Sequence, residues 1–342
     1  MIKFAALTFV SALALAGGHA GAAARPMPGT SGLRVVDRIA GPDGHWDYAS
    51  FDPARRRVYV AHGDTVMVID ADTGKAKADF APGSRLHTVM AIPGSDLVLT
   101  TNSGDSSARI LNAADGSLIA SVPTAKDPDA AIYDPASGLV LVMGGDSGAI
   151  TFVDVKAAKA VGSLVVGGAL EFPALDGKGR LFVNIEDKNE IAVIDLATRK
   201  VIRRYPMTGC TGPSGLAYVT GGRLISACAN GVAKILAAAS GKDLATLQIG
   251  ARPDAVLYDG TRKLAYIPSA MTGTLAVIAL SGPHDNAIID SVITQLGART
   301  GAVDEKTGRI YLPDAQYVLP VPAGQRPATK PGTFEVLVLD RR

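Results

Sequence analysis

Short apolar runs that end in a polar residue and a tight turn recur along most of this chain. Examples are VMVIDADTGK, ARILNAADGS and IAVIDLATRK. The residues that end these runs lie 42, 42, 41, 42 and 42 residues apart, at Asp70, Asn112, Asp154, Asp195, Ala237 and Ala279. A period of roughly 40 to 50 residues, built from strands and turns, is typical of the blades of a β-propeller.

Each period can be divided into four strands, of which the second and third are apolar throughout. Such strands are expected where both faces of a sheet are covered by neighbouring sheets. The second strand occurs seven times, as RVYVAHG, LVLTTNS, LVLVMGG, RLFVNIE, RLISACA, KLAYIPS and RIYLPDA. The pattern therefore predicts an all-β, seven-bladed β-propeller with four-stranded blades.

The two ends of the pattern predict how the ring closes. The seventh unit ends at residues 340–342, directly after its third strand, and an unassigned strand, Leu33–Gly41, precedes the first unit. We expect this N-terminal strand to join the C-terminal blade as its outer strand, since an open ring would leave unpaired edges. Residues 33–342 then form one domain. The Pro-rich segment Val318–Gly332 is predicted to be a loop within the last blade.

The N-terminus has the three-part pattern of a secretory signal peptide: Lys3, an apolar stretch to about Ala16, and small residues near Ala24. We assign residues 1–24 to the signal peptide and residues 25–32 to a flexible leader. The apolar stretch is short for a membrane span, although an uncleaved anchor is the alternative. The mature protein is expected in the periplasm, without a membrane span and as a monomer.

Export makes the only two cysteines, Cys210 and Cys228, informative. An even pair in an oxidising compartment favours a disulfide. Cys210 precedes the fifth blade and Cys228 ends its second strand, so both are expected at the same end of that blade. The alternative is a pair of buried free thiols.

Composition and motifs exclude some classes of function but do not identify one. The formal net charge is +2, and the basic residues are scattered along the chain, which argues against a nucleic-acid partner. We find no GxSxG elbow, P-loop, dinucleotide fingerprint, CxxCH or HExxH motif.

The repeat resembles the YVTN-type β-propeller family, which includes exported YncE-like proteins. The resemblance covers about residues 33–342 and rests on Tyr59-Val60-Ala61, Phe182-Val183-Asn184, the IDxxTGK turn, and the segments KDPDA (126–130) and ARPDA (251–255). The YVTN tetrapeptide itself is absent. The resemblance implies a seven-bladed fold and export, but the family has no single activity.

The register places polar residues at equivalent positions near the start of each blade, where the loops should surround one mouth of the central channel. These positions hold Asp47, His87, Asp129, Glu171, Ser214, Asp254 and either Arg299 or Thr300. The predicted ligand-binding set adds residues from the neighbouring loops: His45, Asp47, His62, Arg85, His87, Asn102, Asp129, Glu171, Asn184, Arg252 and Asp254. Gathered carboxylates either brace adjacent blades, bind a polar ligand or hold a cation.

Three functions follow from these alternatives. The first is a non-catalytic binding or scaffold protein whose channel face binds a small polar ligand, a peptide or an envelope protein. The second is a metal-dependent, lactonase-like hydrolase, with Ca²⁺ or Zn²⁺ held by Asp47, Glu171 and Asp254 and with His87 as base. No other cofactor is predicted. The third, a nucleic-acid-binding propeller, is disfavoured by the charge.

Overall fold

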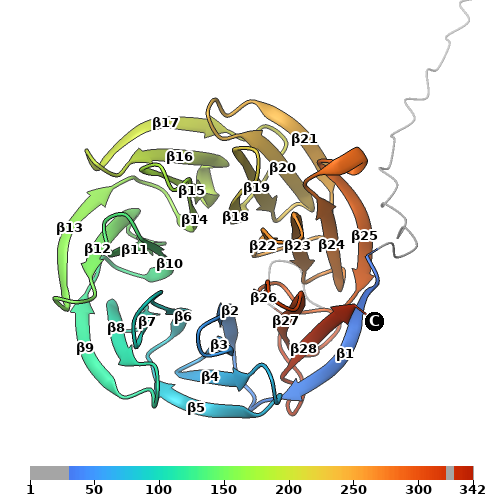
Figure 1. Cartoon of the computed structure of the whole chain (residues 1–342), viewed down its shortest axis with the longest axis horizontal. Coiled ribbons are helices and arrows are strands. Elements are labelled where there is room, and N and C mark those ends of the chain that lie inside the picture. The colour runs from blue at the N-terminus through green and yellow to red at the C-terminus, as the bar shows by residue number, and fades with distance from the viewer. Residues whose placement is uncertain (1–30, 321–326, 342) are drawn as a thin grey trace, which may run out of the picture.

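Seven antiparallel sheets of four strands each stand around a central axis in the computed structural model, which describes residues 31–320 and 327–341 (Figure 1). The predicted seven-bladed β-propeller is therefore confirmed. The predicted signal peptide, residues 1–24, and most of the predicted leader lie outside the described residues. No helix in the described ranges is long and apolar enough to cross a membrane.

The first four blades follow one another along the chain, each running from the strand nearest the axis to the outermost strand (Figure 1). Their strands are β2 (Trp46–Asp52), β3 (Arg57–His62), β4 (Thr65–Asp70) and β5 (Ala76–Pro82); β6 (Leu86–Ala91), β7 (Leu97–Asn102), β8 (Ser107–Asn112) and β9 (Leu118–Pro123); β10 (Pro128–Asp134), β11 (Leu139–Gly144), β12 (Ala149–Asp154) and β13 (Lys159–Val165); β14 (Leu170–Leu175), β15 (Arg180–Ile185), β16 (Glu190–Asp195) and β17 (Lys200–Pro206).

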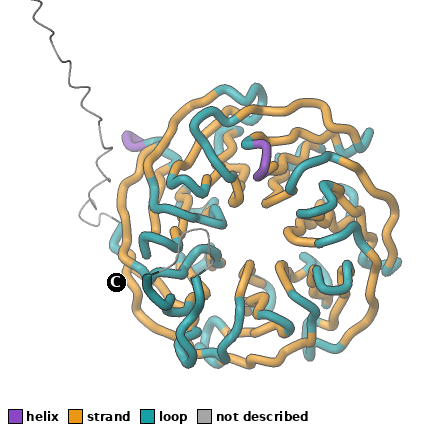
Figure 2. The backbone as a smooth tube through the Cα atoms, turned by 180° about the vertical axis from the view of Figure 1, so that it is seen from behind, coloured by secondary structure: helices purple, strands orange, loops and turns teal. Residues whose placement is uncertain are grey.

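Blades five and six repeat this arrangement, and the inner strands of blades six and seven are short. The remaining strands are β18 (Pro213–Val219), β19 (Arg223–Cys228), β20 (Val232–Ala237) and β21 (Asp243–Gln248); β22 (Leu257–Asp259), β23 (Leu264–Ser269), β24 (Thr274–Ala279) and β25 (Ala287–Ile293); β26 (Ala302–Asp304), β27 (Arg309–Asp314) and β28 (Glu335–Arg341). The described residues also contain two short 3-10 helices, η1 (Glu186–Lys188) beside the central opening and η2 (Gly282–His284) at the outside (Figure 2).

The N-terminal strand closes the ring as predicted. β1 (Leu33–Ala40) pairs antiparallel with β28 and supplies the outer strand of the seventh blade (Figure 1). An ion pair strengthens the junction with the first blade, because Arg56 Nη1 lies 2.8 Å from the buried carboxylate of Asp304. The predicted loop of the last blade, Val318–Gly332, lies between β27 and β28, and its residues 321–326 lie outside the described residues.

The core consists of apolar layers between neighbouring blades. Between the seventh and first blades, Met67 and Val336 are fully buried, and the Trp46 and Phe334 rings lie 5.6 Å apart. The single tryptophan therefore packs at the closure. Since the second and third strands face such layers on both sides, their continuous apolar character follows directly.

In the first four blades the third strand ends in a polar residue that organises the following turn. Asp70 Oδ1 accepts hydrogen bonds from the backbone N–H groups of Asp72 and Thr73 and from the Thr73 hydroxyl. Asp195 makes the same kind of contacts with Thr198. Short acidic side chains favour such turns, which explains why this position recurs through the repeat.

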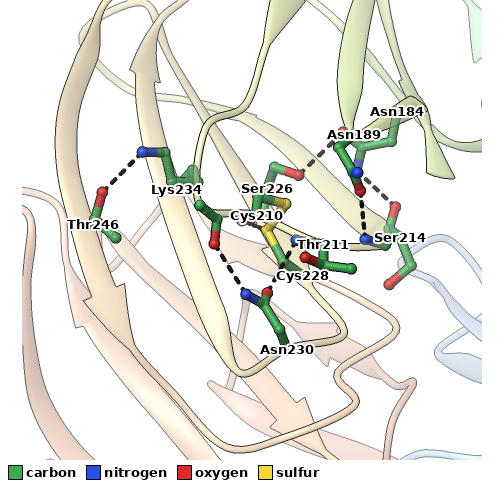
Figure 3. Close-up of a disulfide and its surroundings, with 12 residues drawn as sticks. Asn184, Asn189, Cys210, Thr211, Ser214, Ser226, Cys228, Asn230, Lys234 and Thr246 are labelled. Atoms are coloured by element: carbon green, nitrogen blue, oxygen red, sulfur yellow. Dashed lines mark hydrogen bonds between the residues drawn. A yellow bond between two sulfur atoms is a disulfide. The ribbon is translucent and has the colours of Figure 1, made fainter. Parts of the chain in front are cut away.

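A disulfide joins Cys210 and Cys228, with a Cα–Cα distance of 5.5 Å, so the predicted bridge is confirmed (Figure 3). It ties the loop before β18 to the end of β19. Asn230 braces the same loop, because its side chain accepts from Thr211 N–H and donates to the Gly209 carbonyl (Figure 3).

Candidate functional site at the channel mouth

A β-bulge in the first strand of each of the first five blades positions the candidate residues. The register between first and second strands shifts at Trp46/Ala49, Leu86/Val89, Pro128/Ala131, Leu170/Pro173 and Pro213/Leu216. Asp47, His87, Asp129, Glu171 and Ser214 each lie within these shifts. Bulges re-aim side chains and are common beside functional sites. The seven equivalent positions are hereafter called the mouth ring: Asp47, His87, Asp129, Glu171, Ser214, Asp254 and Arg299.

The chain approaches several of these bulges through a left-handed residue. Arg85, Asp127 and Arg252 have φ values of 49°, 55° and 53°, and each stands two residues before a member of the mouth ring. Their carbonyls accept hydrogen bonds from residues that follow the second strand of the same blade, such as Ser103 for Arg85. These hydrogen bonds hold the mouth loops of each blade together. Such φ values are uncommon for non-glycine residues.

His87 connects three blades at the mouth. Its Nδ1 lies 2.6 Å from Asp47 Oδ2 of the first blade and 3.5 Å from Asp129 Oδ1 of the third. Its Nε2 lies 3.1 Å from the Ser103 hydroxyl. Burial disfavours the imidazolium form, but the hydrogen bond to Asp47 and the charge of Asp129 outweigh it and raise the pKa of His87.

Arg299 occupies the seventh position of the mouth ring. Its Nε lies 3.0 Å from Asp254 Oδ2 without hydrogen-bond geometry, and its Nη2 lies 3.8 Å from Asp47 Oδ1. Nη2 also donates to the Trp46 carbonyl at 2.8 Å. The neighbouring Thr300 is buried and donates to the Asp47 carbonyl, so the alternative between these two residues is resolved in favour of Arg299.

Tyr48 reaches across the channel from the first blade to the fourth. Its hydroxyl donates to Glu171 Oε2 at 3.3 Å, and its ring meets Phe172 edge-on at a centroid distance of 5.1 Å. The tyrosine is buried and packs against apolar residues of the third and fourth blades. Tyr48 therefore links two blades that are not neighbours in the ring.

The carboxyl groups of the mouth ring are held away from water and close to one another. Burial raises the pKa of Asp129 to about 8, and the charge of Asp47 adds to this effect. Burial raises the pKa of Asp254 to about 6 although Arg299 opposes the shift. Burial and the charge of Asp129 raise the pKa of Glu171 well above its usual value. Repulsion and desolvation of this kind are typical of sites that receive a cation or a proton.

Three of the predicted ligand-binding residues are instead buried within the blades. The Asn102 side chain accepts from Ser84 N–H and donates to Thr100, and the Asn184 amide donates to the Ser214 and Gly215 carbonyls. Both asparagines are completely buried. His62 is buried with its ring 4.3 Å from that of Phe334, and burial lowers its pKa. These three side chains brace the loops rather than face the channel.

The other predicted residues lie at the outer margin of the mouth. His45, Arg85 and Arg252 are exposed. Arg85 Nη1 lies 4.0 Å from Asp127 Oδ1, a separation that permits only weak attraction at the surface. The structure therefore brings together Asp47, His87, Asp129, Glu171 and Asp254 and leaves the remaining predicted residues outside this group.

One group of three side chains among the described residues has the spacing of metal ligands. Donor atoms of Asp47, His87 and Asp129 lie within 4.8 Å of one another. The predicted metal set of Asp47, Glu171 and Asp254 shares only Asp47 with this group. The predicted set and the observed group differ because the side chain of His87, and not that of Glu171, lies between Asp47 and Asp129.

Tyr48 and Ser103 were not predicted as site residues. Tyr48 flanks Asp47 in the sequence, but its register alone does not indicate that it spans the channel. Ser103 directly follows the second strand of blade two, a position that the blade register assigns to the same mouth. That register was the signal that could have identified Ser103.

Comparisons with known proteins show the fold alone. No family model matches the chain, and no curated protein matches its sequence. A chain of the Kuenenia stuttgartiensis hydrazine synthase has a TM-score of 0.69 at 15% identity, over 78% of this chain and 91% of that chain. A chain in the crystal structure of the mitotic checkpoint complex has a TM-score of 0.72 at 13% identity, over 92% and 96% of the two chains. One fold can carry many unrelated functions, so these two matches assign no role to the chain.

Proposed function

We propose that this protein is an exported binding protein that holds a small, positively charged ligand at the mouth of its channel. The observation that carries the proposal is the unbalanced charge of the mouth ring. Four acidic side chains converge there, and only two basic side chains belong to the ring. The acidic side chains are those of Asp47, Asp129, Glu171 and Asp254, and the basic ones are those of His87 and Arg299. The signal-peptide pattern and the resemblance to exported YVTN-type propellers support periplasmic export.

Bracing between blades does not account for the whole arrangement. Ser214 and Thr300 each brace a neighbouring blade with one hydrogen bond to a backbone carbonyl. The acids instead lie close enough to raise one another's pKa, as the effect of Asp47 on Asp129 shows. An excess of carboxylates over basic groups destabilises a fold where the carboxylates are withdrawn from water, and a bound cation that stabilises the carboxylates would explain why they are retained.

The same charge argues against a nucleic-acid ligand, because phosphates would be repelled from the acidic mouth. A peptide or an envelope protein would fit the proposal only through a basic group that enters the mouth. Hydrolysis is not included, since no observation identifies an attacking group beside a substrate position.

Thermal unfolding in the presence of small ions tests the proposal. Spermidine and Zn²⁺ should raise the melting temperature by several degrees at saturating concentration, whereas citrate and phosphate should not, because only a cation gains energy from the mouth ring. The triple variant Asp47→Asn, Asp129→Asn, Asp254→Asn should remove the response to both cations while retaining the β-sheet circular dichroism spectrum.

The matched control replaces three exposed acids away from the mouth: Asp79→Asn, Asp96→Asn and Asp115→Asn. This variant has the same net charge as the mouth variant and should respond to cations like the wild-type protein. If neither cation stabilises the wild-type protein, or if both variants respond equally, the proposed function is wrong.

A further inference from the structure

Three potential ligand atoms from three blades converge at one side of the mouth. They are His87 Nδ1, Asp47 Oδ2 and Asp129 Oδ1, with Nδ1 2.6 Å and 3.5 Å from the two oxygens. The three side chains are only slightly exposed, at 19%, 16% and 17%. Asp129 Oδ1 is itself buried and has no hydrogen-bond partner.

The Ser103 hydroxyl lies 3.1 Å from His87 Nε2 and 3.1 Å from the Arg85 carbonyl. When this hydroxyl donates to the carbonyl, it accepts from Nε2–H. Nδ1 is then the nitrogen whose lone pair is available to a metal ion. Without a metal ion, the 2.6 Å contact with Asp47 Oδ2 is a hydrogen bond from Nδ1–H.

The Nδ1 proton satisfies Asp47 but leaves Asp129 Oδ1 without a hydrogen bond. A metal ion placed between the three atoms would satisfy all of them at once. Metal-ligating histidines typically donate their other N–H to an oxygen, which is the part that Ser103 takes here.

We infer that Asp47, His87 and Asp129 form a binding site for one divalent transition-metal ion, with Zn²⁺ as the representative. Metal–ligand distances of about 2.0–2.2 Å place ligand atoms roughly 3.3–3.6 Å apart in tetrahedral geometry. His87 Nδ1 lies 2.6 Å and 3.5 Å from the two carboxylate oxygens, and ligand atoms of all three side chains lie within 4.8 Å of one another. A metal ion would therefore require His87 and Asp47 to move slightly apart. One imidazole and two carboxylates favour a transition metal over Ca²⁺, which prefers six to eight oxygen ligands.

Three protein ligands would leave at least one coordination position of Zn²⁺ free. This inference rests on the proposed function and deepens it, since the metal is the positive charge that the mouth ring attracts. Water or an oxygen atom of a further ligand would occupy the free position.

Metal titration of the full-length mature protein tests the inference. After dialysis against EDTA, isothermal titration calorimetry should show one Zn²⁺ per chain, with Ca²⁺ at least tenfold weaker. Co²⁺ should produce visible absorption bands of a low-coordinate site containing a nitrogen ligand. His87→Gln and Asp129→Asn should each weaken Zn²⁺ at least 100-fold. Ser103→Ala should weaken it about 10- to 100-fold, because Ser103 positions the imidazole.

The exposed Asp79→Asn variant, on the outer strand β5, should bind Zn²⁺ like the wild-type protein. Circular dichroism and thermal unfolding without metal should confirm that every variant is folded. Absence of Zn²⁺ binding, or unchanged affinity in the His87→Gln variant, would overturn the metal site. Stabilisation by spermidine in that case would still support the proposed function, so the two failures can be told apart.

Discussion

At the scale of single residues, Asp314 illustrates a carboxyl group that the fold buries without a compensating partner. It ends β27, is completely buried, and neither oxygen has a hydrogen-bond partner. Burial raises the pKa of Asp314 to about 7, against a weaker opposing effect of the Ala315 backbone N–H. The folded protein therefore holds this proton more tightly than the unfolded chain, in which an aspartate titrates near 3.9.

The Asp314→Asn substitution should reduce the pH dependence of stability. In the wild-type protein, the proton on Asp314 favours the folded state below about pH 4, and this advantage is lost as the pH rises to about 7. The neutral amide removes the titration, so the variant should gain a few kcal/mol relative to wild type at pH 8. Urea unfolding at pH 4, 6 and 8 measures the difference, and Asp79→Asn serves as an exposed control. Parallel profiles for Asp314→Asn and wild type would contradict the assignment.

The sequence allowed the members of the mouth ring to be aligned but not their pairing. The repeat places Asp47, His87 and Asp129 at equivalent positions, because each follows the same turn at the start of its blade. Whether His87 turns toward Asp47 or away from it depends on the bulge and on Ser103, and neither is encoded in the local pattern. Asn102 and Asn184 were expected at the mouth for the same reason. The register of a blade gives the position of a residue along the channel axis, but it does not give the hydrogen-bond partners of its side chain.

At the scale of elements, the fifth blade is distinguished by its covalent link. The disulfide between Cys210 and Cys228 spans 18 residues and fixes the loop that leads to Ser214. Polar contacts around it, such as the Asn189 side chain accepting from Gly212 N–H, hold the same loop against the fourth blade (Figure 3).

Removal of this disulfide should destabilise the protein by about 2–3 kcal/mol, because a closed loop of this length restricts the unfolded chain. The double variant Cys210→Ala, Cys228→Ala should show this loss in urea unfolding. Dithiothreitol should lower the stability of the wild-type protein to a similar value and leave the variant unchanged. Equal stability of the two oxidised proteins would argue against a structural contribution of the bridge.

Most elements were predictable because their signals are local. A third strand ends at Asp70 or Asp195, whose side chain bonds the next turn, so the period appears directly in the sequence. The short inner strands of the sixth and seventh blades were not evident. There, Pro253 pairs with Ser269 only as an isolated bridge, and the strand proper begins at Leu257.

At the scale of the whole molecule, closure of the ring depends on a strand from the opposite end of the chain. β1 pairs with β28 from Leu33↔Arg341 to Ala40↔Glu335. Without it, β28 would be an unpaired edge, and the layer between blades seven and one would lose the contacts of Val36 and Ile39. The prediction of this pairing required only that every blade have the same number of strands.

A chain that begins at Gly41 should therefore be much less stable than one that begins at Ser31. We expect a loss of at least several kcal/mol together with a tendency to aggregate, because an edge strand becomes available to other molecules. Thermal unfolding and size-exclusion chromatography measure both effects. The chain that begins at Ser31 is the control and should match the mature protein. Equal melting temperatures for the two chains would show that the ring does not need β1.

Tyr48 has a consequence for the rigidity of the mouth. Its hydroxyl donates to Glu171 Oε2 and its ring packs edge-on against Phe172, so one side chain ties the first blade directly to the fourth, which is not its neighbour in the ring. We expect the Tyr48→Phe variant, which keeps the ring and removes the hydroxyl, to loosen this link without opening the apolar layer around it.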